Sequence, residues 1–383
     1  MMKLTIRRKK AVISLTQLGY YLIIIIAVLR AMQFHVNSGD NMDLARHFYM
    51  MQLIKRSGYS FFEYVFLHGD AFTSNITLKF NYAFNAIVYL ISNYTTNYYI
   101  ISWVFVFIDY AIIAYIGIDW WKSQGGRKGF MALYEILICF SLFPLIHAIS
   151  GLRTSLAACI MGLAIYLYIY KNKSFISFAI ATILAALIHP AFLTAVPFAI
   201  IAKKMERKKG LLISVIASVA VSSMANIFIR TSNNFLHSIA YKYLQYKGES
   251  GYRGTRFCYY GVLVICLLTL AGYFYIFFLR KSFGNHDQVK KALDTDDNSR
   301  VVIYDFVVYY MIFILSNFGA YEMVLRPAYL LGAMAPILTG LSCGVQGKCR
   351  RLDGVLTILL AILFGISIYV FYMYLIWHNE YFL

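Results

Sequence analysis

The chain has 383 residues, of which 61% are hydrophobic and 14% are charged, and its formal net charge is +18. Soluble domains average about 25% charged residues, so this composition excludes an ordinary soluble protein and predicts an all-α protein embedded in a membrane. The basic residues lie in short loops between apolar runs, which indicates membrane orientation rather than nucleic-acid binding.

Nine apolar runs are long enough to cross a bilayer as helices. Two further stretches are ambiguous, because 80–92 is short and 175–202 is too long for one crossing. We therefore expect a single membrane domain over residues 1–383 with about 10–12 transmembrane helices. The nine runs cover approximately 12–34, 98–119, 129–149, 154–171, 211–229, 257–279, 302–318, 325–342 and 355–377.

The basic loops orient these runs, because cytoplasmic loops of membrane proteins carry an excess of Lys and Arg. With the basic residues of 3–10 in the cytoplasm, alternation returns the loops 122–128, 171–173 and 203–209 to that side. If 80–92 crossed the membrane fully, the segments that precede the core would exchange sides, and the loop 122–128 would lie outside. The expected topology has 35–97 as the first external segment, 151–202 as the core, 230–256 as an external loop and 280–301 as a cytoplasmic loop.

The core segment predicts a broken-helix hairpin. Since the loops on both sides of 175–202 are basic, this stretch must enter and leave the membrane on one side. Pro190 interrupts the helix, and irregular backbone is tolerated at membrane depth where it lines a cavity. The hairpin raises His189 toward Arg153. Because ionisable residues in apolar segments are functional-site candidates by default, we expect these two residues to form one polar site.

Three polar residues of the first external segment have helical spacing. Asp43, Arg46 and His47 stand at i, i+3 and i+4, so one face of a short helix can present a carboxylate, a guanidinium and an imidazole. The alternative interpretation is a solvated interfacial helix in which Asp43 and Arg46 form a weak surface salt bridge. Spacing alone favours this alternative.

Two arginines open apolar runs on the expected external side. Arg153 follows a glycine, and Arg326 precedes Pro327 and follows Glu322 by one helical turn. Guanidinium groups and helix N-termini both suit phosphate oxygens. The alternatives are a snorkelling arginine at the interface and, for His189, a buried histidine bonded to a backbone carbonyl.

The external loop 230–256 interleaves basic residues with tyrosines, among them Tyr252, Arg253 and Arg256. Such a loop can hold an anionic head group or a glycan, or can rest in the interface. The chain has no P-loop and no His-Glu-x-x-His, so we expect no metal, no cofactor and no nucleotide. A reaction would then use an already activated substrate.

Three stretches give a family resemblance: DLARHF at 43–48, the Arg and His helices of 151–192, and LRPAYLLGAMAPIL at 325–338. With these motifs the chain resembles the EpsG-type, or Wzy-like, bacterial exopolysaccharide polymerases. The resemblance implies a GT-C-like membrane glycosyltransferase that joins polyprenyl-diphosphate-linked oligosaccharides on the external face of the bacterial plasma membrane. It also implies membrane lipid, a flippase and a chain-length regulator as partners.

In this interpretation Arg153 and Arg326 bind the diphosphates and stabilise the leaving group, while Asp43 or His189 acts as general base. The residues expected to contact substrate are Arg46, His47, Tyr252, Arg253, Arg256, Glu322 and Tyr329. The rival functions are a ligase with the same chemistry, a transporter of lipid-linked oligosaccharides, and a membrane acyltransferase acting on sugars.

Overall fold

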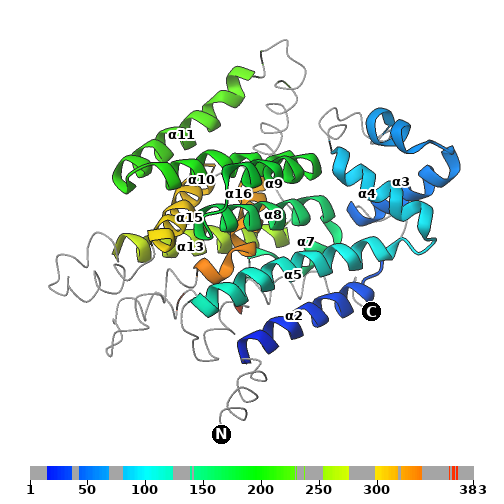
Figure 1. Cartoon of the computed structure of the whole chain (residues 1–383), viewed down its shortest axis with the longest axis horizontal. Helices are drawn as coiled ribbons and strands as arrows, with labels where there is room; N and C mark the ends of the chain where they lie inside the picture. The colour runs from blue at the N-terminus through cyan, green and yellow to red at the C-terminus, as the bar shows by residue number, and fades with distance from the viewer. Residues whose placement is uncertain are drawn as a thin grey trace, which may run out of the picture.

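The structure is a computed structural model, and its regular elements are all helices in the part of the chain that it describes (Figure 1). This confirms the predicted all-α membrane fold. The described residues are 15–36, 43–68, 81–123, 139, 142–228, 230, 237, 253–275, 298–317, 321–338, 362, 365–366 and 368–369.

The helices follow one another without intervening strands in these described segments. Their bounds are α2 Leu15–Met32, α3 Asp43–Ser57, η1 Glu63–His68, α4 Tyr82–Tyr94, α5 Tyr99–Ser123, α7 Leu145–Ser150, α8 Leu152–Ile165, η3 Tyr166–Tyr170, α9 Phe175–Ile188, η4 Pro190–Thr194, α10 Ala195–Lys204, α11 Arg207–Phe228, α13 Arg253–Phe274, α15 Asn298–Ser316 and α16 Tyr321–Ala333.

Among the described helices, three are long and apolar enough to cross a membrane, namely Tyr99–Trp120, Leu152–Tyr170 and Ser299–Ser316. Four shorter apolar helices accompany them in α2, α9, α13 and α16. The total of 10–12 transmembrane helices stays a prediction, since most of the runs 129–149 and 355–377 lie outside the described residues. The 13-residue α4 is about 20 Å long, shorter than the hydrocarbon core, in line with a topology in which 80–92 does not cross.

Helix α8 lies at the centre of the bundle, where it packs against α5, α7, α9 and α16 (Figure 1). It is apolar on all sides, as a fully surrounded helix should be. Small residues allow the close approach of α16: a Cβ added at Gly162 would lie 3.3 Å from the Cβ of Ala333. On the far side of α5 runs α2, whose Tyr20 ring lies directly over Gly117.

The broken-helix hairpin is present. Helix α9 ends at Ile188, His189 is extended (φ −156°, ψ 111°), and η4 and α10 lead the chain back. Both limbs meet Tyr168, because Phe178 of α9 stacks on its ring and the Lys203 ammonium of α10 lies 3.9 Å from the ring centroid. The two limbs therefore start and finish at one end of the bundle, and His189 lies at the other.

The end of the bundle that contains Tyr168 also gathers the basic loops, and we call it the basic end. Its cations meet acceptors from neighbouring helices. The pairs are Lys171 Nζ with Asp119 Oδ2 at 2.6 Å, Arg207 Nε with Asp305 Oδ1 at 2.9 Å, Arg300 Nη2 with the Ser123 carbonyl at 2.6 Å, and Lys203 Nζ with the Tyr168 carbonyl. The loops expected to share one side of the membrane thus lie together; the prediction that this side is cytoplasmic stays a prediction.

Candidate functional site

The opposite end of the bundle holds the polar residues of the candidate site. Helices α3, α4, α8 and α16 and the His189 break between α9 and η4 converge there. Arg153 stands in the first turn of α8, immediately after the kink that Gly151 makes between α7 and α8. The start of α8 is therefore turned toward the N-terminal end of α4, and the tip of the hairpin adjoins both.

Arg153 is held by α4. Its guanidinium carbon lies 5.7 Å from the centroid of the Phe84 ring, within the range of a cation–π contact. With the Asn81 amide oriented so that its oxygen faces Arg153, that oxygen accepts a hydrogen bond from Arg153 Nη1 at 3.1 Å. In the same orientation the Asn81 nitrogen donates to the carbonyl of Ile188 at 3.2 Å.

Asn81 therefore joins three elements at one point. It is 1% exposed and precedes α4 at the N-cap position, where Asn commonly accepts a hydrogen bond from its own helix. Here the side chain makes no such cap and reaches across to α8 and to the end of α9 instead. Sequence reasoning missed this residue, although an Asn at the start of a short helix inside an apolar stretch was a visible signal.

His189 meets two different groups through its two ring nitrogens. Nδ1 accepts a hydrogen bond from the backbone N–H of Ala191 at 3.3 Å, which caps η4. Pro190 has no N–H, so Ala191 is the first residue of this short helix that needs an acceptor. Nε2 lies 3.3 Å from Nη1 of Arg326, which comes from α16. The sequence grouped His189 with Arg153; in the structure Arg326 contacts the ring, while Arg153 is linked through Asn81 to the adjacent residue Ile188.

The first turns of α3 separate the three residues that the spacing had grouped. Asp43 and Arg46 form an exposed salt bridge at 3.2 Å, with side chains 47% and 66% exposed. His47 turns inward, is 3% exposed and lies 5.0 Å from the Phe84 ring, measured between ring centroids. The cause is helix geometry: Arg46 and His47 are consecutive and point about 100° apart around the helix, so packing on α4 buries His47 and leaves Arg46 exposed.

Burial, followed by the positive charges of Arg153 and Arg46, lowers the pKa of His47 from 6.5 to about 3, against the opposing charge of Asp43. The ring is therefore neutral near pH 7. Its Nδ1 has no hydrogen-bond partner among the described residues. His47 thus contributes an uncharged polar surface beside Arg153.

Tyr329 packs against two ring side chains that come just before α8. Its ring lies 5.3 Å from that of His147 and 6.0 Å from that of Phe143. The remaining predicted substrate contacts fall outside what the structure describes. The structure does not describe Tyr252, and it describes only the backbone of Arg253, Arg256 and Glu322. The roles of these four residues therefore stay predictions.

The chemistry of the assembled site suits an anion. Its characteristic groups are two guanidinium ions, a neutral imidazole and an amide, which supply hydrogen-bond donors and positive charge. Within the described segments no cluster of three or more His, Cys, Asp or Glu is placed to hold a metal ion.

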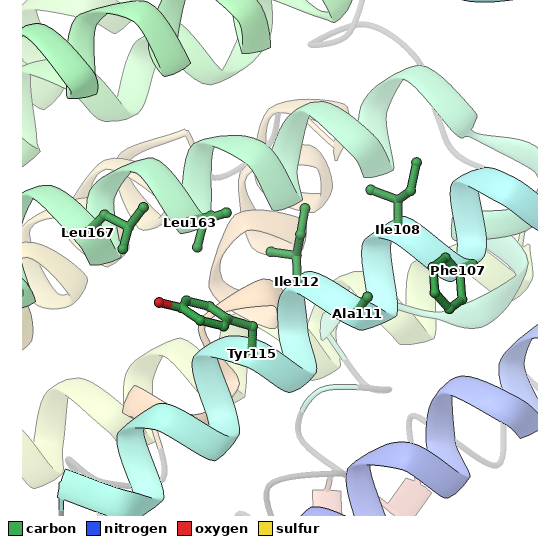
Figure 2. A pocket seen from close by; sticks show the side chains of 7 residues that line it. All are labelled: Phe107, Ile108, Ala111, Ile112, Tyr115, Leu163 and Leu167. Atoms are coloured by element: carbon green, nitrogen blue, oxygen red, sulfur yellow. The ribbon is translucent and has the colours of Figure 1, made fainter.

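An apolar cavity of about 360 Å³ opens between α5 and α8 (Figure 2). Among the described residues that line it, Tyr115 alone carries a polar side-chain atom, so it suits hydrocarbon and not a phosphate. The lining residues are Phe107, Ile108, Ala111, Ile112, Tyr115, Leu163 and Leu167.

Comparison with known proteins gives one family. The EpsG family matches residues 18–382, nearly the whole chain. No curated protein and no solved structure gives a significant match.

Proposed function

Because the chain belongs to the EpsG family, which makes it an exopolysaccharide-related membrane protein, we propose that it polymerises lipid-linked repeat units. The donor is a growing glycan on polyprenyl diphosphate, and the acceptor is the terminal sugar of a second lipid-linked unit. The reaction takes place on the external face of the membrane, where the candidate site is expected to lie.

The observation that carries this proposal is that Arg153 and Arg326 both reach the break between α9 and η4. Arg326 Nη1 lies 3.3 Å from His189 Nε2, and Arg153 is joined through Asn81 to the carbonyl of Ile188, the residue before His189. Two guanidinium groups near one point make the local potential positive, and an anion bound there gains from both. A diphosphate supplies that anion, and it is the leaving group of the proposed reaction.

In the transfer step the acceptor hydroxyl attacks the anomeric carbon of the donor glycan. The bond from that carbon to the diphosphate oxygen breaks, and its electron pair stays on the diphosphate. Arg153 and Arg326 stabilise this growing charge, so the leaving group needs no proton. A base removes the hydroxyl proton, and Asp43 and His189 are the candidates from the sequence.

The lipid part of the donor needs an apolar surface that continues from the diphosphate. The cavity between α5 and α8 meets this need, because it lies on the helix that carries Arg153 (Figure 2). Leu163 stands ten residues after Arg153, or about 15 Å along the helix. We propose that isoprene units of the donor occupy this cavity.

The test is deletion of the gene in its host, with complementation by wild type, Arg153→Ala or Arg326→Ala. Surface and lipid-linked glycans are separated on a gel. We expect the polymer ladder to collapse to single repeat units and to be restored by wild type, with each arginine variant at least about 100-fold less active. Arg56→Ala is the matched control, since Arg56 is exposed at the far end of α3 and should restore the ladder.

Other outcomes would replace the proposal. Long polymer that stays on its lipid carrier would identify a ligase. Repeat units that accumulate in the cytoplasmic leaflet would identify a transporter. Protein levels in the membrane must be equal for all variants, because an absent protein would imitate a loss of activity.

A further inference from the structure

The His189 ring stands between two hydrogen-bond donors. The backbone N–H of Ala191 lies 3.3 Å from Nδ1, and Nη1 of Arg326 lies 3.3 Å from Nε2. A neutral imidazole has one nitrogen that accepts and one that donates, and an arginine in a protein keeps its protons. Both contacts therefore cannot be hydrogen bonds in the same tautomer.

The contact with Ala191 decides the tautomer. Ala191 is two residues from His189, and its N–H is positioned by the backbone of η4, which begins with Pro190. A proton on Nδ1 would point at this N–H and leave the start of η4 without its cap. Arg326 comes from another helix on a long side chain and can adjust its position. Nδ1 is therefore the acceptor, and Nε2 carries the proton.

In this tautomer two N–H donors face one another across 3.3 Å, one from His189 and one from Arg326. Neither satisfies the other, whereas a single anionic oxygen beside both would accept from each. Arg153, oriented by Asn81, adds positive charge to the same place. The arrangement has the form of an oxyanion site.

We propose that His189 binds the diphosphate of the lipid-linked donor as a neutral Nε2–H donor beside Arg326, and that it is not the general base. The identity of the anion rests on the proposed function. When the bond from the anomeric carbon to the diphosphate breaks, the electron pair moves to the oxygen that His189 and Arg326 hold. The proton of the acceptor hydroxyl goes to Asp43, the remaining candidate base.

The first experiment measures binding with the full chain in nanodiscs. The probe is farnesyl diphosphate, with farnesol as the control that lacks the anion. Glutamine places an amide N–H near the position of Nε2, so His189→Gln should bind within about threefold of wild type, while His189→Ala should bind about tenfold more weakly. Equal binding by wild type and His189→Ala would overturn the inference.

The second experiment measures polymer formation between pH 6 and 8 by the same variants. An amide cannot accept a proton at these pH values, and loss of a general base costs about 100- to 10,000-fold. We expect His189→Gln to stay within about tenfold of wild type, with the acidic limb of its pH profile unchanged. If His189→Gln is as inactive as His189→Ala, His189 is the base and the inference fails while the polymerase function stands.

A third measurement does not depend on activity. Nitrogen-15 spectra of wild type labelled at histidine, with His189 assigned by difference from His189→Gln, report which ring nitrogen carries the proton. An unprotonated Nδ1 is expected, and a protonated Nδ1 would overturn the inference. Suppose that wild type binds farnesyl diphosphate better than farnesol, and His189→Ala binds it more weakly, but wild type makes no polymer. Then the proposed function fails, while the inferred anion site stands.

Discussion

The two ends of the bundle treat positive charge differently. At the basic end, Lys171 meets Asp119 and Arg207 meets Asp305, so two of the described cations are matched by carboxylates within the fold. At the site end, the contacts of Arg153 and Arg326 include an amide, an aromatic ring and an imidazole. Positive charge at the basic end holds neighbouring helices together, whereas positive charge at the site end gathers around the break at His189.

This difference separates stability from function. A cation beside a carboxylate contributes little net positive potential to a ligand. Removing one partner of such a pair mainly destabilises the fold. Two guanidinium groups that come together from different helices make the potential at their meeting point more positive, and an anion bound there gains from both. Substitutions at the basic end should therefore lower stability and leave activity per folded molecule unchanged. Substitutions at the site end should mainly lower anion binding or activity.

The largest effect on stability is expected from Asp305→Ala at the basic end. Its Oδ1 accepts from Arg207 Nε at 2.9 Å and from the Tyr273 hydroxyl at 2.5 Å, and the residue is 6% exposed. Removing it leaves a mostly covered guanidinium without its carboxylate, which should lower the free energy of unfolding by about 3 kcal/mol. Denaturant titration in detergent micelles measures this change.

The control for this comparison is Glu206→Ala. Glu206 forms an ion pair with Lys209 at 3.2 Å, but both side chains are more than 70% exposed, so the loss should stay below about 0.5 kcal/mol. Polymer formed per folded molecule should be unchanged in both variants. A loss of specific activity in Asp305→Ala with unchanged stability would contradict the division between the two ends.

A smaller effect on stability is expected at His47 and depends on pH. The folded pKa of about 3 is below the unfolded value of 6.5, so between these values the unfolded chain binds a proton that the folded chain excludes. Stability is therefore complete above pH 6.5 and falls on acidification, by about 2 kcal/mol at pH 5. Comparing the free energy of unfolding at pH 7 and pH 5 measures it.

His47→Phe should remove most of this loss, because phenylalanine keeps the contact with the Phe84 ring and does not titrate. The matched control is His237→Gln at an exposed position, which should leave the difference between pH 7 and pH 5 unchanged. An equal acid destabilisation in wild type and His47→Phe would assign the effect to other groups.

The smallest effect is expected from Asn81→Asp, which would give Arg153 at the site end a carboxylate partner like those at the basic end. Asn81→Asp retains an oxygen for Arg153 and adds a negative charge, as at the basic end. We expect an ion pair with Arg153 that offsets the lost hydrogen bond to the Ile188 carbonyl, while binding of farnesyl diphosphate weakens by about tenfold, equivalent to about 1.4 kcal/mol. The effect should appear in KM more than in kcat.

Asn93→Asp is the matched control. Asn93 lies near the end of the same helix α4, is exposed and bonds only locally, to the Tyr89 carbonyl at 3.0 Å among the described contacts. It should bind the diphosphate as wild type does. Undiminished binding by Asn81→Asp would show that Arg153 does not act through its charge on the anion.

Much of the fold could be predicted because its signals are local. Long apolar runs and basic loops identified a helical membrane protein, and the basic residues flanking 175–202 predicted the hairpin with His189 at its tip. Arginines that open apolar runs pointed to Arg153 and Arg326. Each of these signals depends on residues within one or two neighbouring segments, where hydrophobicity and charge act directly.

Only the tertiary structure decided which groups meet. The partner of Arg153 is Asn81, and the partner of Arg326 is His189, 137 residues away in the chain. The inward turn of His47 and the donor on each side of the His189 ring likewise follow from how separate helices pack. Helix spacing fixes which side chains share a face, but hydrogen bonding requires atoms within about 3 Å, and that distance is set by packing between helices.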